Sequence, residues 1–282
     1  DRVMLVLKRH YQFWFAILGL HKLGAIAIPA TNQLVKHDLE YRFNAAEVSA
    51  IVCTADGSVA DQVDLAAAEA PCLKTKILVG GQREGWRDFD EEFPLYSAHF
   101  YRTEDTPCGD DPMIMFFTSG TTGSSKCVML SEKNIASCVN SACESVNFNE
   151  NDTTVSVLPL HHTYELAIML ASLCYGFTIC INDTLRHLMR NFAEFKPTGL
   201  ILVPLYVETM QKKIWAEIEK KGKTKLVKRM IPIALKLPRS IRRKIFKDII
   251  DAFGGRLRYV ICGAAAMKPE SVDFFRDLGI TV

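Results

Sequence analysis

Short β-rich runs alternate with helix-length segments through the first eighty residues, and this alternation constrains the fold more than any other feature. Val3–Leu7 precedes an amphipathic stretch over residues 11–23, "AIAIP" precedes "HDLEYRFNAAEV", and "SAIVC" precedes "VADQVDLAAAEA". Strands that alternate with helices in this way form parallel sheets whose faces are covered by the helices. The sequence therefore predicts an α/β fold.

The same alternation resumes after residue 113, where "TTVSVLPL", "FTICI", "GLILVP" and "LRYVIC" are typical of buried strands. Between the two regions, residues 80–111 are rich in Gly, Pro, acidic and aromatic residues and show no clean period. We expect a long surface excursion there.

Composition indicates an ordinary globular protein, because 49% of the 282 residues are hydrophobic and 23% are charged. The nine cysteines are scattered in apolar contexts without a CxxC pair, which favours reduced thiols over disulfides or zinc. The longest uncharged stretch, residues 166–181, contains Gly176 and is shorter than the ~20 residues of a membrane span. We expect a helix, a turn and a strand over this stretch.

The stretch "FTSGTTGSSKCV", residues 117–128, follows a strongly β run and leads toward a helix for which Ser131 is a candidate N-cap. It has the composition of a phosphate-binding loop, because glycines let backbone N–H groups approach, hydroxyls donate hydrogen bonds and a lysine supplies charge. A plain surface turn is the alternative. A P-loop is excluded by spacing, since Lys126 lies between Ser125 and Cys127 rather than between Gly and Ser or Thr.

This stretch resembles the phosphate loop of the AMP-forming adenylating enzymes, which include acyl-CoA synthetases, luciferases and peptide-synthetase adenylation domains. Their loop usually reads Thr-Ser-Gly-Thr-Thr-Gly, any residue, then Pro-Lys-Gly. Lys126 falls in place, whereas Ser125 and Cys127 depart from the pattern. The residues that match without a gap are Thr118, Ser119, Gly120, Thr121, Thr122 and Gly123.

Further matches follow in the order of that family. "LPLHHTYE" resembles the segment whose histidine lines the acyl-carboxylate site, which corresponds to His162 here. His161 and His162 can alternatively be a structural pair at a strand end. "ICGAAAMKPE" resembles the strand end that forms a wall of the adenine and acyl pocket, which corresponds to Gly263, Ala264 and Ala265. A tight turn or close helix packing is the alternative for these small residues.

The resemblance implies two stacked α/β subdomains that make up most of a large N-terminal domain. We expect residues 1–155 to carry the phosphate loop and residues 156–282 to carry the pocket wall. It also implies that the family's C-terminal domain lies outside this chain, and that residues 1–282 alone are inactive.

The resemblance further implies an AMP-forming acid–CoA ligase. Such an enzyme activates a carboxylic acid, here a fatty acid, with ATP to an acyl-adenylate and transfers the acyl group to coenzyme A. Lys126 and His162 would be the catalytic residues, with the loop and Gly263–Ala265 binding the nucleotide. Mg²⁺ would arrive with ATP, bound mainly through phosphates, so no metal ligand is assigned in this chain. The alternatives are a fatty acyl-AMP ligase or adenylation domain that feeds a carrier protein, and a non-catalytic nucleotide-binding or membrane-docking module.

A basic segment, residues 220–247, contains twelve of the 34 Lys and Arg residues and none of the 32 acidic residues. Ile241, Ile245, Phe246 and Ile249 recur there at helical spacing, which predicts an amphipathic helix. It is either a solvated helix face or a surface that docks on anionic membranes, and it can also attract coenzyme A phosphates. Sparse aromatic residues argue against nucleic acid. We expect a cytoplasmic protein with peripheral membrane contact.

Overall fold

The computed structural model describes residues 1–102, 104, 106–118 and 125–282. These residues form two compact units, which are described separately. The first contains residues 1–141 and 159–167, and the second contains residues 142–158 and 168–282. The single division near residue 155 stays a prediction.

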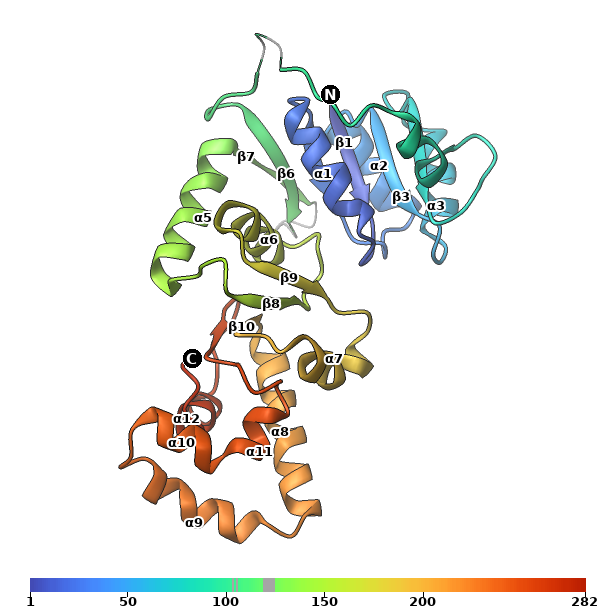
Figure 1. Ribbon diagram of the computed structural model, residues 1–282. Helices are drawn as coiled ribbons and strands as arrows, with labels where there is room; N and C mark the ends of the chain where they lie inside the picture. Colours follow the sequence, from blue (N-terminus) through green and yellow to red (C-terminus); the bar gives the residue numbers. More distant parts are fainter. Residues whose placement is uncertain (103, 105, 119–124) are drawn as a thin grey trace. The chain divides into compact units, whose positions relative to one another are not determined.

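The first unit is built on a seven-stranded sheet in the order β5-β4-β3-β1-β2-β6-β7 (Figure 1). Every neighbouring pair is parallel except β6 and β7, which form an antiparallel hairpin at one edge. The mostly parallel sheet confirms the predicted fold class. Its strands are β1 (Arg2–Val6), β2 (Ile26–Pro29), β3 (Ala50–Thr54), β4 (Thr75–Val79), β5 (Arg87–Asp88), β6 (Pro112–Thr118) and β7 (Lys126–Ser131).

Helices cover this sheet because its central strands are apolar on both faces. The helices are α1 (Gln12–Lys22), α2 (Lys36–Ala45) and α3 (Val59–Ala67). On one face, Phe43 of α2 and Val63 of α3 pack with Met4 and Val6. The connection from β2 to β3 runs back past β1, so right-handed crossovers place α1 on the opposite face, where its Phe13 is fully buried.

The expected surface excursion over residues 80–111 contains some regular structure. The short strand β5 pairs with β4, and it is followed by α4 (Phe89–Glu92) and a 3-10 turn, η1 (Phe93–Leu95). The carboxylate of Asp88 caps α4 by accepting hydrogen bonds from the backbone N–H groups of Asp90 and Glu91.

The predicted helix start at Ser131 is confirmed, since α5 (Glu132–Val146) begins at the next residue. Ser131 Oγ accepts from the N–H of Asn134 at 3.3 Å, and Asn134 Oδ1 accepts from the N–H of Ser131 at 3.0 Å. This reciprocal pair is a capping box with Asn in the place of the usual Glu or Gln. It fixes the direction of the chain as it leaves the hairpin.

The second unit contains two parallel strand pairs, β8 (Thr153–Ser156) with β9 (Thr178–Ile181), and β10 (Gly199–Leu202) with β11 (Tyr259–Cys262). Thr198 joins them: its N–H donates to the carbonyl of Thr153 at 2.8 Å, and its Oγ1 accepts from the N–H of Thr153 at 3.0 Å. Gly199 is required beside β11, because a Cβ there would lie 2.2 Å from the ring of Tyr259.

The helices around these strands bury a core that includes Phe192, Val207, Phe253 and Phe275. The expected helix, turn and strand over residues 166–181 are confirmed, as most of α6, Gly176 and β9. The remaining elements are α6 (Thr163–Tyr175), η2 (Leu185–His187), α7 (Leu188–Phe195), α8 (Pro204–Lys220), α9 (Thr224–Ala234), α10 (Arg239–Ile245), α11 (Lys247–Asp251) and α12 (Pro269–Asp277).

The amphipathic helix expected around residues 241–249 is interrupted. Phe246 has φ −98° and ψ 28°, outside helical geometry, and separates α10 from α11. Its side chain is only 3% exposed, and Ile245 and Ile249 pack against the same core. Most of the apolar positions that suggested a membrane-facing surface therefore stabilise the second unit.

Candidate functional site

The β6–β7 hairpin contains the two residues that flank the predicted phosphate loop. Thr118, the last residue of β6, is the ladder partner of Lys126, the first residue of β7. The Oγ1 of Thr118 donates to the Lys126 carbonyl at 3.5 Å, and the Lys126 side chain is exposed. The central loop positions, Ser119, Gly120, Thr121, Thr122 and Gly123, lie outside the described residues.

Cys127, which replaces the family's glycine, continues the strand. It is paired with Phe117 in the antiparallel register and is exposed. Its Cβ is thus accommodated by ordinary strand geometry, in which side chains leave the ladder on alternate faces.

Two residues of α2 brace this hairpin, and nothing in the sequence pattern singled them out. The hydroxyl of Tyr41 donates to the carbonyl of Ser125 at 2.7 Å, next to the loop. The guanidinium of Arg42 lies 5.0 Å from the centroid of the Phe117 ring, within the range of a cation–π contact. The two arms of the hairpin are therefore tied to one helix. A Tyr-Arg pair on a helix that follows a strand is too common to have indicated this role.

The two histidines occupy a turn that leads into α6. The N–H of His162 donates to the Pro159 carbonyl at 3.0 Å, and the rings of His161 and His162 have centroids 4.4 Å apart. Burial, assisted by the nearby charges of His162 and Arg42, lowers the pKa of His161 to about 4, so that ring is neutral at pH 7. The His162 side chain is exposed.

Arg42 also connects the histidine turn with the hairpin. Its charge acts on the pKa of both His161 and Cys127, so Arg42 lies near both segments. Within the first unit, Arg42 therefore lies near the hairpin strand that contains Phe117 and near the histidine turn.

In the second unit, Gly263, Ala264 and Ala265 directly follow β11, at the carboxyl end of the strand. The N–H of Gly263 donates to the carbonyl of Leu202, the last residue of β10, at 3.3 Å. Ala264 has φ +71°, a left-handed conformation that costs a residue with a Cβ about 1–2 kcal/mol. Both alanines are exposed. In open α/β sheets, ligands bind outside the carboxyl ends of the strands, and a strained backbone there is a feature of binding sites.

Within the described ranges, no three His, Cys, Asp or Glu side chains gather as a metal site. Among the same residues, no helix has both the length and the apolar character needed to cross a bilayer.

Comparison with known proteins identifies the family. The sequence profile described as "AMP-binding enzyme" matches residues 1–282. The chain belongs to the AMP-binding enzyme family. The resemblance inferred from the phosphate loop is therefore confirmed.

Curated relatives of this AMP-binding chain include acyl-coenzyme A synthetases. Over 131 residues it is 40% identical to the human "Acyl-coenzyme A synthetase ACSM5, mitochondrial", which covers 45% of this chain and 22% of that protein. Over 276 residues it is 26% identical to the Arabidopsis thaliana "Long chain acyl-CoA synthetase 6, peroxisomal". That alignment covers 89% of this chain and 38% of the plant protein. The chain thus spans between about a fifth and two fifths of these relatives.

Solved structures share the fold of this AMP-binding chain. The N-terminal domain of FACL13 from Mycobacterium tuberculosis superposes with a TM-score of 0.77 at 19% identity, over 99% of this chain and 61% of that one. A long-chain-fatty-acid-CoA ligase, FadD1, from Archaeoglobus fulgidus superposes with a TM-score of 0.74 at 16% identity. The superposition covers 98% of this chain and 48% of that one.

Proposed function

We propose that the protein to which this chain belongs is an AMP-forming acid–CoA ligase. The observation that carries the proposal is the antiparallel pairing of Thr118 with Lys126, the residues that flank the family's loop, in a chain whose named relatives are acyl-coenzyme A synthetases. In the first half-reaction, a carboxylate attacks the α-phosphate of ATP, and an acyl-adenylate and pyrophosphate are formed. In the second, the thiol of coenzyme A takes the acyl group and AMP leaves.

The first half-reaction brings two anions together, so its main demand on the protein is charge neutralisation and alignment. Lys126, the first residue of β7, supplies a positive charge directly after the predicted loop. We assign the β- and γ-phosphates to this lysine, to the loop hydroxyls of Ser119, Thr121 and Thr122, and to nearby backbone N–H groups. Magnesium bound with ATP would neutralise further phosphate charge.

His162 and the small residues after β11 complete the proposed assignment. The exposed ring of His162 would line the site of the acyl carboxylate, while His161, held neutral by burial, has a structural role. Gly263, Ala264 and Ala265 would form a flat wall for the adenine ring or acyl group, because side chains no larger than a methyl leave the backbone accessible.

For the acid, we propose a fatty acid, on the strength of the long-chain enzyme among the relatives. For location, we propose a cytoplasmic protein with peripheral membrane contact through residues 220–247. Exposed Leu226, Ile233 and Leu235 lie among the lysines of this segment and support the contact. Fractionation of cells that express the full-length protein tests this against the mitochondrial and peroxisomal locations in the relatives' names.

The decisive experiment measures the two half-reactions separately in the full-length protein. Lys126→Ala should slow acyl-adenylate formation by roughly 10- to 150-fold, the equivalent of one charge-assisted contact of about 1.5–3 kcal/mol. Thioester formation from a supplied acyl-adenylate should change much less. Lys133→Ala, an exposed lysine on α5, is the matched control and should leave both steps unchanged.

Other outcomes would overturn the assignment. Equal losses in both half-reactions would mean that Lys126 only supports folding. Acyl-adenylate formation without acyl transfer to coenzyme A would favour a carrier-protein acceptor. Absence of any ATP-dependent activation, across acids from acetate to palmitate, would favour a non-catalytic nucleotide-binding module.

A further inference from the structure

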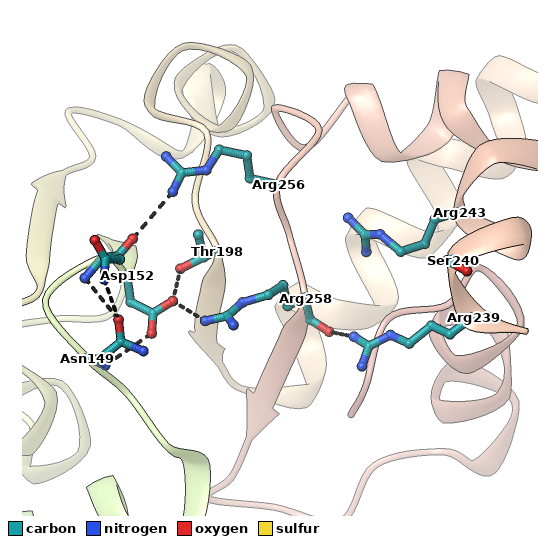
Figure 2. A pocket seen from close by; sticks show the side chains of 9 residues that line it. Asn149, Asp152, Thr198, Arg239, Ser240, Arg243, Arg256 and Arg258 are labelled. Atoms are coloured by element: carbon teal, nitrogen blue, oxygen red, sulfur yellow. Dashed lines mark hydrogen bonds and ion pairs between the residues drawn. The ribbon is translucent and has the colours of Figure 1, made fainter.

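A second polar site lies in the second unit, at the amino ends of the strands. It is a hollow of about 710 Å³, here called the arginine hollow (Figure 2). Asp152, Thr198 and Arg258 each directly precede a strand, whereas Gly263 follows the opposite end of β11. The arginine hollow is therefore separate from the proposed acyl and adenine wall. It is lined by Asn149, Asn151, Asp152, Thr198, Arg239, Ser240, Arg243, Arg256 and Arg258.

The arginine hollow carries four guanidinium groups and a single carboxylate. That carboxylate, Asp152, is 1% exposed and its hydrogen-bonding capacity is largely used. Its Oδ1 accepts from Arg258 and, at 2.5 Å, from the hydroxyl of Thr198, while Oδ2 accepts from the N–H of Asn149 at 3.1 Å. Asp152 thus neutralises Arg258 and leaves the other three arginines without a counter-charge from the lining.

Those three arginines are held in place by backbone carbonyls, which orient a guanidinium without neutralising it. Arg239 donates through Nε to the Gly279 carbonyl at 2.7 Å and through Nη2 to the Arg258 carbonyl. Arg243 donates to the carbonyls of Gly255 and Leu257, in the segment between α11 and β11. Arg256 donates to the Asn151 carbonyl at 3.3 Å.

Each guanidinium has five N–H donors, so at least three remain on each of these arginines. In the described part of the chain, no carboxylate lies within ion-pair distance of Arg239, Arg243 or Arg256. Figure 2 shows Arg256 and Arg258 on one side of the pocket and Arg239 and Arg243 on the opposite side. Burial, together with the charges of neighbouring arginines, lowers the pKa of both Arg239 and Arg243. A bound anion would relieve this repulsion.

We propose that the arginine hollow binds a small anion with two or more phosphoryl groups. Fixed guanidinium forks suit phosphate oxygens, which they contact through paired N–H donors. A volume of about 710 Å³ lies within the usual range of small-molecule sites and exceeds the needs of one phosphate. The phosphoryl groups belong to a soluble molecule or to a phosphorylated lipid headgroup. The competing explanation is that the arginines only tie the adjacent loops together.

The test measures binding of inorganic pyrophosphate to the full-length protein by calorimetry. All variants are compared in a Lys126→Ala background, which weakens any pyrophosphate contact at the phosphate loop. Arg256→Gln should weaken binding at least about tenfold, equivalent to ~1.4 kcal/mol. The fold should survive this change, because the exposed Arg256 side chain makes one long hydrogen bond. Lys236→Gln removes an exposed charge that lies outside the hollow, in the basic segment that also contains Arg239 and Arg243, and should change affinity less than twofold.

Ser240→Glu supplies a second, independent variant. It places a carboxylate at the lining without removing any arginine–carbonyl contact, so it should abolish pyrophosphate binding and leave the thermal unfolding midpoint unchanged or raised. A second arm uses phosphatidylcholine vesicles that carry either a phosphatidylinositol phosphate or an equal charge of phosphatidylserine. Retention on the phosphoinositide alone, lost in Arg256→Gln, would support the proposal with a lipid headgroup as the source.

Three results would overturn the proposal. They are the absence of binding in both arms, equal effects of Arg256→Gln and Lys236→Gln, and unchanged pyrophosphate affinity in Ser240→Glu. The catalytic half-reactions do not enter this test, so its failure leaves the proposed ligase activity untouched.

Discussion

Replacing the buried carboxylate with an amide, Asp152→Asn, should destabilise the second unit strongly. Asp152 lies at the entrance to β8 and holds Thr198 before β10 and Arg258 before β11. An amide cannot accept hydrogen bonds at both of its terminal atoms. In one orientation of the introduced amide side chain, its NH₂ group would face the N–H of Asn149, so two donors would meet. In the other orientation, the NH₂ group would face the donors of Thr198 and Arg258.

The magnitude follows from the exposure of the two partners. Breaking a fully buried ion pair costs about 3–5 kcal/mol. Here Asp152 is 1% exposed but Arg258 is 48% exposed, so water can restore part of the solvation of the guanidinium. We therefore expect a loss of about 2–4 kcal/mol in the free energy of unfolding, against a total of roughly 5–15 kcal/mol for a typical domain.

The pH dependence of this loss is also defined. Burial alone raises the pKa of Asp152, but hydrogen bonds from Thr198, Arg258 and the N–H of Asn149 outweigh it, and the net pKa is lowered. A depressed folded-state pKa stabilises the protein above the unfolded value of about 3.9, and this contribution disappears as pH falls through the folded pKa. The gap between wild type and Asp152→Asn should be constant near neutral pH and narrow below about pH 4.

Urea unfolding measures the difference in the free energy of unfolding between wild type and Asp152→Asn. Amide hydrogen exchange should show the loss of protection at β8, β10 and β11. Asp248→Asn is the matched control, because Asp248 is 78% exposed and lies 3.8 Å from Lys223, a surface pair that contributes about 0–1 kcal/mol. A cost below 1 kcal/mol for Asp152→Asn, or one no larger than that of Asp248→Asn, would show that the carboxylate does not hold the three strand entrances together.

Three further outcomes are expected. Ala264→Gly should stabilise the protein by roughly 0.5–1 kcal/mol, because relief of ~1–2 kcal/mol of left-handed strain exceeds the ~0.4–1 kcal/mol gained by the more flexible unfolded chain; an unchanged or lower thermal midpoint would contradict this. Between pH 6.5 and 4, the unfolded chain binds a proton at His161 more readily than the folded protein, whose pKa there is about 4, so the free energy of unfolding falls as the pH falls. His161→Gln should make this fall smaller. The same decrease in the wild type and in the variant would refute the prediction. Lys225→Gln combined with Leu226→Gln should reduce co-sedimentation with phosphatidylserine vesicles, in a salt-dependent way and without affecting neutral vesicles; equal retention of wild type and variant would refute membrane contact through α9.

The sequence was most informative where structure is local. The alternation of strands and helices and the cap at Ser131 depend on residues close together in the chain, so pattern and composition predict them. The break at Phe246 was missed because its cause is tertiary. The Phe246 side chain is buried in the core of the second unit, and the spacing of apolar residues alone does not predict a helix break at this position.

Long-range partners explain the missed parts of both candidate sites. Asp152 and Arg258 are 106 residues apart, and Tyr41 reaches Ser125 across 84 residues. Arg239 and Arg243 lie in the basic segment, for which the sequence predicts either a solvated helix face or a membrane-docking surface. Their hydrogen bonds go to backbone carbonyls, which are present at every residue and so leave no signature in the sequence.

The pairing of Thr118 with Lys126 has a consequence for engineering. Both ends of the connection over residues 119–125 are set by the β6–β7 ladder, whatever amino acids lie between them. The contact from Tyr41 uses the backbone carbonyl of residue 125, which any substitute supplies. The seven-residue connections of other members of the AMP-binding enzyme family can therefore be inserted between Thr118 and Lys126 and compared in one protein.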